Sequence, residues 1–179
     1  MFTVCIFCGG ALGDTPQFAE AARHIARLLV EKGCGIVFGG GSVGLMGVVA
    51  DAALAAGGHV TGVAPRLLLE KEVVHHGLTE LHVVENIHQR KEMMAAKSDA
   101  FLVLPGGYGT LDELFEVLTL QQLGVHGKSC GLLNVDGFFD TLTAYLDHAT
   151  ACGFLRTEYR NMLAVDADAA ALLAKIGVH

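Results

Sequence analysis

Residues 98–124 carry the residue types best suited to chemistry on a phosphorylated ligand. The apolar run from Ala100 to Leu104 predicts a short buried strand, which Pro105 closes. The loop that follows is rich in glycine: Gly106, Gly107 and Gly109. Glycine lets the chain turn sharply and lets a ligand approach the backbone. We expect Thr110 to open a helix, so that strand, loop and helix together aim free backbone N–H groups at an anion.

Glu113 places a carboxylate in the first turn of that helix, three residues after Thr110. One interpretation is a capping box, in which the two side chains satisfy each other's orphan backbone amides. The other is catalytic, because the carboxylate borders a loop suited to phosphate and the basic pair Arg90-Lys91 lies upstream on the preceding predicted helix. A carboxylate, a guanidinium and a glycine loop together suit a sugar phosphate. The spacing alone leaves both interpretations open.

A second glycine loop, residues 39–44, follows a predicted strand at residues 35–38 and matches the G-x-G-x-x-G pattern. The dinucleotide fingerprint also expects an acidic residue about twenty positions on, at the end of the next strand. That strand, predicted at residues 59–63, has no acid, and Asp51 falls within the intervening helix. We therefore interpret the loop as a phosphate or nucleotide contact outside the NAD mode. The alternative is that its glycines serve close packing of helix on strand.

Strand and helix patterns alternate along the chain, from a first strand predicted at residues 3–7 to a last helix predicted to start at Asp166, which is typical of a parallel sheet covered by helices on both faces. The helix predicted at residues 138–151 has Phe138 on its inward side. We predict an α/β fold, a Rossmann-like doubly wound parallel sheet in a single domain spanning residues 1–179. Ligands of such sheets bind at the carboxyl ends of the strands, where both glycine loops fall. Asn86 is expected to cap a helix carrying Arg90 and Lys91. Neighbouring helical residues cannot share one direction, so one of these two should face the site and the other solvent or a partner.

Three stretches together resemble the motifs of one enzyme family. They are Pro105-Gly-Gly-Tyr-Gly-Thr-Leu-Asp-Glu113, similar to PGGxGTxxE, Ile87-His-Gln-Arg-Lys91, similar to MHxRK, and Gly39-Gly-Gly-Ser-Val-Gly-Leu-Met-Gly47, similar to another glycine loop. The sequence thus resembles the Lonely Guy (LOG) family of cytokinin riboside 5′-monophosphate phosphoribohydrolases, many of which were formerly called lysine decarboxylases. The likeness runs from about Val4 to Phe154.

This resemblance implies hydrolysis of the N-glycosidic bond of an N6-substituted AMP, giving free base and ribose 5-phosphate without a cofactor. It implies that Arg90 and Glu113 are catalytic. A glutamate between the third strand and the Arg-Lys helix contacts substrate in the family, and we choose Glu72 over Glu70 for it. The substrate-binding residues we expect are Gly40, Gly41, Ser42, Glu72, Arg90, Lys91, Gly106, Gly107, Tyr108, Gly109, Thr110 and Thr119.

One departure from the family concerns the first loop, which usually reads CGSS and here is Cys8-Gly-Gly-Ala11. Two hydroxyls expected near the nucleotide are therefore absent. The sequence leaves open whether plain AMP or an N6-substituted AMP is the main substrate. It also leaves open a second class of function, a nucleotide or cofactor carrier without catalysis, as in related molybdenum-cofactor carriers. Lysine decarboxylation is disfavoured, because it needs pyridoxal phosphate on a lysine and no recognisable motif for it is present.

The composition bears on the class of protein and on its partners. Of the 179 residues, 52% are hydrophobic and 17% charged, which suits a substantial core and predicts some apolar surface buried between subunits. The resemblance to the LOG family implies a homodimer, and this composition agrees with it. The net charge of −7 argues against nucleic-acid binding. No apolar stretch reaches the roughly 18 residues of a membrane span. The first residues lack the basic leader of a signal peptide, so we expect a cytoplasmic enzyme without membrane contact.

The cysteines and histidines predict no metal site. Five cysteines without framework spacing are expected to be reduced, buried thiols. Cys5 and Cys8 form a C-x-x-C pattern within a predicted strand, where residues three apart point to opposite faces. The histidines show neither H-x-x-x-H nor H-E-x-x-H spacing, so we propose no zinc site from the sequence.

Overall fold

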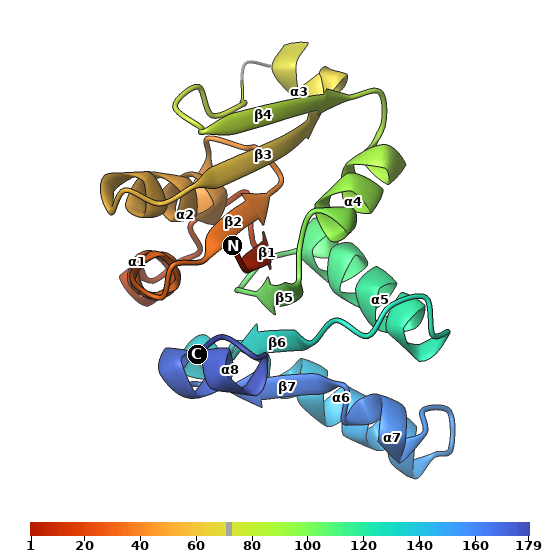
Figure 1. Ribbon diagram of the computed structural model, residues 1–179. Helices are drawn as coiled ribbons and strands as arrows, with labels where there is room; N and C mark the ends of the chain where they lie inside the picture. The colour runs from red at the N-terminus through yellow and green to blue at the C-terminus, as the bar shows by residue number, and fades with distance from the viewer. Residues whose placement is uncertain (71–72) are drawn as a thin grey trace.

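Seven parallel strands form one sheet in the computed structural model, which describes residues 1–70 and 73–179 (Figure 1). The strands are β1 (Thr3–Phe7), β2 (Gly35–Phe38), β3 (Val60–Pro65), β4 (Glu80–Val84), β5 (Ala100–Val103), β6 (Cys130–Leu133) and β7 (Leu163–Asp166). Their order across the sheet is β4-β3-β2-β1-β5-β6-β7, and each neighbouring pair is parallel. The predicted α/β class with a doubly wound parallel sheet is confirmed.

Helices cover both faces of this sheet (Figure 1). They are α1 (Pro16–Glu31), α2 (Gly44–Ala55), α3 (Arg66–Glu70), α4 (Ile87–Ala96), α5 (Tyr108–Gln122), α6 (Asp140–Ala151), α7 (Thr157–Arg160) and α8 (Ala169–Lys175), with a 3₁₀ turn, η1 (Val135–Gly137). Helices α1, α2 and α8 lie on one face, and α4, α5 and α6 lie on the other. Among the helices that the structure describes, none has both the length and the apolar character needed to cross a bilayer.

The sheet separates two hydrophobic clusters, because its central strands are buried on both faces. Alternate residues of one strand therefore enter different clusters. Cys5 packs with the α4 and α5 side, and Cys8 packs on the α1 and α2 side. The predicted opposite orientation of these two thiols is confirmed. Of the five free cysteines, Cys152 is exposed, so the expectation that all are buried was wrong for this one.

The sheet changes its winding direction between β1 and β5. These strands are neighbours in the sheet, but β2, β3 and β4 extend to one side of them and β6 and β7 to the other. The loops after β1 and β5 therefore diverge onto opposite faces, and a crevice opens between them. A backbone hydrogen bond from Gly9 N–H to Pro105 O, 2.9 Å long, joins the two loops at its base.

Two helix starts differ from their predicted positions. The helix expected to open at Thr110 begins at Tyr108, with Gly107 as its N-cap. The last helix, expected from Asp166, begins at Ala169, where the Asp168 carboxylate accepts a hydrogen bond from Ala171 N–H. The predicted cap at Asn86 is confirmed, since its side chain accepts hydrogen bonds from two backbone amides of α4.

Candidate active site

A cavity of about 510 Å³ lies in the crevice between the β1 and β5 loops. Its walls come from both loops, from the first turns of α1 and α2 and from the first two turns of α5, with one residue each from α4 and the segment before α6. The lining residues are Cys8, Gly9, Gly10, Ala11, Leu12, Gly13, Phe18, Leu45, Met46, Arg90, Pro105, Gly106, Gly107, Gly109, Thr110, Glu113 and Phe138. The cavity thus brings together the first loop, the PGGxGTxxE stretch and Arg90.

The N-terminus of α5 opens onto this cavity. The first bond of the helix runs from Leu111 N–H to Gly107 O, so the preceding amides have no acceptor within the helix. Gly106 lies directly before this turn, where a side chain could not fit. A Cβ there would overlap the Thr110 hydroxyl and lie 2.9 Å from Gly9 N. The loop is therefore closely packed while its amides and the helix dipole remain suited to an anion.

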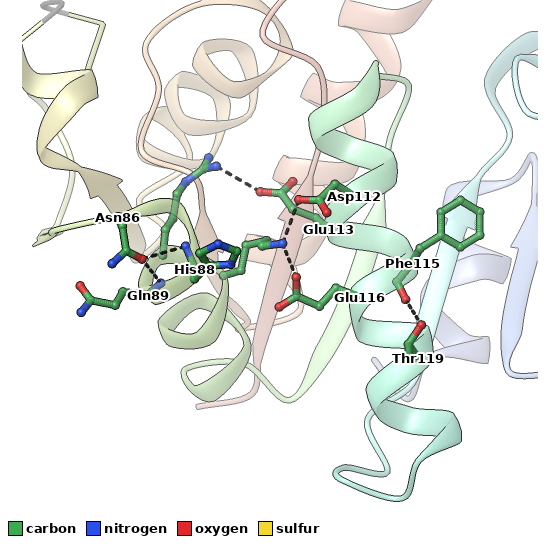
Figure 2. A network of polar contacts seen from close by, with 10 residues as sticks. Asn86, His88, Gln89, Asp112, Glu113, Phe115, Glu116 and Thr119 are labelled. Carbon is green, nitrogen blue, oxygen red and sulfur yellow. Dashed lines mark hydrogen bonds and ion pairs between the residues drawn. The ribbon is translucent and has the colours of Figure 1, made fainter.

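Glu113 pairs with Arg90 across the gap between α5 and α4. Arg90 Nη1 lies 3.2 Å from Glu113 Oε1, and both side chains are largely buried. Figure 2 shows Glu113 directed toward α4 and the ion pair as a dashed line. The helix begins at Tyr108, which puts Glu113 in its second turn, beyond reach of the capping positions. The capping-box interpretation of Thr110 and Glu113 was therefore wrong, and the carboxylate belongs to the cavity wall.

Burial controls the protonation of Glu113. Desolvation raises the pKa of its carboxyl to about 7, and the positive charge of Arg90 opposes part of that rise. Folding thus raises the pKa, so this carboxyl contributes stability that is present below its ordinary pKa of 4.5 and lost as the pH rises through about 7. A carboxyl with a pKa near neutrality in a cavity is typical of catalytic groups.

The pH dependence of activity should report this carboxyl. If the ionised form of Glu113 is the active one, kcat/KM should fall about tenfold per pH unit below an inflection near pH 7. A pH series of initial rates would measure the inflection, and the residual activity of Glu113→Gln should lack it. An inflection that survives in the variant would assign the titration to another group, such as the substrate phosphate.

Comparisons with known proteins identify the family of this chain. A family profile described as "Possible lysine decarboxylase" matches residues 46–176. A probable cytokinin riboside 5′-monophosphate phosphoribohydrolase of Oryza sativa subsp. japonica is 47% identical over 97% of this chain and 70% of its own length. A cytokinin riboside 5′-monophosphate phosphoribohydrolase of Arabidopsis thaliana is 44% identical, covering 97% and 76%. The chain belongs to the LOG family.

Solved structures show how widely the fold of this LOG protein is shared. A molybdenum cofactor binding protein from the phototrophic bacterium Rippkaea orientalis matches with a TM-score of 0.74, covering 98% of this chain and 94% of its own. Only 20% of the aligned residues are identical. At that identity the match establishes the fold alone.

Lys91 of the LOG Arg-Lys pair lies on a different side of α4 from Arg90. Its ammonium is 2.9 Å from Asp112 Oδ2 and also pairs with Glu116, so it joins α4 to α5 (Figure 2). The lysine is largely buried and lies outside the cavity lining. The expectation that the two basic residues point in different directions is confirmed, but the expectation that the second would face solvent or a partner was wrong, because Lys91 pairs with carboxylates of α5. The structure brings Arg90 to the cavity and places Lys91 between the helices.

The second glycine loop contacts another part of the chain. Ser42 N–H and its hydroxyl both donate to Val73 O, at 2.8 and 3.1 Å, and His75 N–H donates to Gly40 O at 2.9 Å. Gly41 forms a bridge with Val74. These predicted substrate residues lie outside the cavity lining, and their substrate contact stays a prediction.

Three other predicted substrate residues also lie away from the cavity lining or cannot be placed. Tyr108 is 95% exposed at the start of α5, beside the cavity mouth. Thr119 is exposed farther along α5, where its hydroxyl donates to Phe115 O (Figure 2). Glu72 lies outside the described residues. Of the predicted residues, the cavity gathers Gly106, Gly107, Gly109, Thr110, Arg90 and Glu113.

Sequence reasoning missed the apolar wall of the cavity. Its side chains come from four separate segments: Leu12, Phe18, Met46 and Phe138. The Phe18 and Phe138 rings pack edge to face with their centroids 5.5 Å apart. Phe138 is exposed, whereas its helical pattern predicted an inward position. Each residue looks like ordinary core in its own segment, and only the position of Phe18 and Met46 near helix N-termini could have indicated a site at the strand ends.

Proposed function

We propose that this LOG protein hydrolyses the N-glycosidic bond of an N6-substituted AMP to free base and ribose 5-phosphate. The observation that carries the proposal is the buried Glu113–Arg90 pair at the wall of a cavity that also receives the N-terminus of α5. The N-terminus of α5 suits a phosphate, and the cavity wall supplies a carboxylate and a guanidinium. Part of the lining is apolar, which suits a purine with an apolar N6 group.

In the proposed complex the 5′-phosphate accepts hydrogen bonds from the free amides at the start of α5. This anchor would place the sugar beside Glu113. As the bond between the anomeric carbon and the purine nitrogen breaks, its electron pair leaves with the base and positive charge develops on the ribose. The Glu113 carboxylate stabilises that charge and orients the water, or a ribose hydroxyl, for the second half of the reaction. Water then adds to the anomeric carbon and its proton neutralises the base.

Arg90 is assigned to electrostatic stabilisation of the departing purine or the phosphate. Its Nε–H donates to Val63 O at 3.1 Å, and Nη1 faces Glu113. A guanidinium has five N–H donors, so others remain for a ligand. Because it stays protonated at any physiological pH, it supplies fixed charge and is a poor proton donor.

The direct test is to incubate the purified protein with N6-isopentenyl-AMP or with AMP and to measure the release of free base by chromatography. We expect base and ribose 5-phosphate in equal amounts from the preferred nucleotide, and no release by Glu113→Ala. The ratio of the two rates measures the effect of the N6 group in a site whose first loop carries Gly10 and Ala11, both exposed at the cavity. Binding of both nucleotides without base release would refute the enzyme proposal.

The other candidate, which the sequence left open, is a nucleotide or cofactor carrier without catalysis. Nucleotide binding without turnover would favour it. Lysine decarboxylation, the activity in the description of the family profile, has less support. Pyridoxal phosphate enzymes of that kind hold the cofactor on a lysine. The described cavity lining contains no lysine.

A homodimer is part of the proposal. One face of α5, which we call the outer face, carries Tyr108, Leu111, Phe115 and Thr119 at helical spacing. Phe115 is directed away from the Glu113 network in Figure 2 and is 38% exposed. Apolar side chains in this arrangement are typical of subunit contacts. The outer face begins at Tyr108, beside cavity-lining Gly107 and Gly109, so a dimer formed there would border the active site.

Phe115→Asp should convert the dimer to a monomer, because it would bury a carboxylate in an apolar interface. Light scattering after gel filtration should show the mass falling by half at micromolar concentration. Val83→Asp is a matched control, since Val83 is also an exposed apolar residue but lies on β4, at the far edge of the sheet. A wild-type monomer, or a Phe115→Asp dimer, would contradict the proposed interface.

The remaining proposals concern domain, location and partners. We propose a single domain over residues 1–179, because all the described strands belong to one sheet. The free cysteines support a reducing compartment such as the cytoplasm. The negative net charge supports a small-molecule partner over nucleic acid. Among the described residues, no group of three or more His, Cys, Asp or Glu side chains is placed to hold a metal ion.

A further inference from the structure

The guanidinium of Arg90 lies over the backbone of Gly39, the first residue after β2. A Cβ built on Gly39 would overlap Arg90 Nη2 and lie 2.6 Å from Cζ and 3.2 Å from Nε. The three heavy atoms nearest to such a Cβ therefore all belong to this one side chain. Gly39 and Arg90 are far apart in the sequence, and the contact exists because α4 packs over the end of β3, beside β2.

Two further groups complete the surroundings of this guanidinium. Val63 O, on the strand next to β2, accepts the Nε hydrogen bond at 3.1 Å. The Glu113 carboxylate faces Nη1 at 3.2 Å. We call Gly39, Val63 O and Glu113 together the Arg90 seat. Two of its three members are backbone groups, one in β3 and the other directly after the neighbouring strand β2.

We propose that Gly39 is a positioning residue for catalysis. Because glycine has no side chain, the Arg90 guanidinium can lie against the backbone at this position and face the Glu113 carboxylate. This inference rests on the proposed function and assigns a role to a glycine that does not line the cavity. Gly39 would act only through Arg90. The contact with Arg90 is also a physical reason for glycine at position 39 that differs from a ligand contact and from helix packing.

Alanine at Gly39 should leave the fold intact and move the guanidinium. Arginine has a long, flexible side chain, so its end can yield to a methyl group with little cost to the backbone. The displaced guanidinium would then lose its alignment with Glu113 and with the ligand. A misplacement of about 1 Å in an active site can cost roughly a hundredfold in rate.

The experiment is a double-mutant cycle on base release, with wild type, Gly39→Ala, Arg90→Lys and the double variant. We expect Gly39→Ala to lower kcat by about 10- to 100-fold with a smaller change in KM. A lysine at position 90 has no guanidinium to collide with the methyl group. In the Arg90→Lys background the same glycine substitution should therefore cost less than about threefold, which is the non-additivity expected of groups in contact.

Gly131→Ala is the matched control for overpacking. Gly131 is a buried sheet glycine on β6, where an added Cβ would lie 2.8 Å from Ile176 Cγ2. This variant should keep the wild-type kcat even where its melting temperature falls. Equal kcat losses from Gly39→Ala in both backgrounds would overturn the inference in favour of a structural role. A Gly39→Ala protein that keeps the wild-type kcat, or fails to fold, would overturn it as well.

A readout independent of turnover separates this inference from the proposed function. NMR titration of the carbon-labelled Glu113 carboxyl should show a higher pKa in Gly39→Ala than in wild type, because the displaced guanidinium stabilises the carboxylate less. If the pKa of Glu113 is the same in Gly39→Ala and in wild type, Gly39 does not position Arg90, even if the enzyme is active. If wild type releases no base, the proposed function fails, and this titration still decides whether Gly39 positions Arg90.

Discussion

Replacing Glu113 with glutamine should lower kcat for base release by about a thousandfold, roughly 4 kcal/mol of transition-state stabilisation. Glutamine keeps the shape of the side chain and can still accept a hydrogen bond from Arg90. It lacks the negative charge that faces the developing positive charge on the ribose. The interaction lost is therefore made in the transition state, and KM should change little. Initial rates at saturating nucleotide would measure the loss.

Glu113→Asp tests whether placement matters as well as charge. It keeps the carboxylate but shortens the side chain and so withdraws the carboxylate from Arg90, and we therefore expect an intermediate kcat. Far-UV circular dichroism and thermal unfolding should show that both variants are folded. If Glu113→Gln retained more than about a tenth of the wild-type kcat, the carboxylate would not be the group that stabilises the ribose, and the mechanism would have to be rebuilt.

Replacing Arg90 with alanine should lower kcat/KM by about two to three orders of magnitude, since it removes a fixed positive charge from a largely buried position at the cavity. A second consequence concerns Glu113. Arg90 opposes the effect of burial on this carboxyl, so its removal should raise the pKa of Glu113 further above its ordinary value. The acid limb of the pH–rate profile should therefore move to higher pH in the variant.

The distribution of the Arg90 effect between kcat and KM identifies what the guanidinium contacts. A loss confined to KM indicates a ground-state contact with the phosphate, whereas a loss in kcat indicates stabilisation of the departing purine. Lys91→Gln is the matched control, because Lys91 is the neighbouring cation but pairs with Asp112 and Glu116 between α4 and α5. A rate loss in this control as large as in Arg90→Ala would contradict the separate roles that the structure gives these residues.

The sequence by itself determined the elements and the chemistry-bearing motifs. Strands such as Thr3–Phe7 and Gly35–Phe38 have the predicted bounds, because a strand buried on both faces leaves an unbroken apolar run. The cap at Asn86 could be predicted because its partners are two and three residues away. The fold class followed from the alternation of these local patterns, and the glycine loop after β5 followed from its composition. All of these depend on near neighbours in the chain.

The tertiary structure decided everything that depends on residues distant in the chain. The spacing alone allowed Glu113 to be part of a helix cap, and the start of α5 at Tyr108 excludes that interpretation. The ion pair to Arg90 places the carboxylate at the cavity instead. The same holds for the apolar wall, whose side chains reach the cavity from separate segments. The need for a glycine at position 39 depends on Arg90, whose guanidinium lies over it in the fold. Strand order and helix packing create such contacts, and local patterns of residues do not record them.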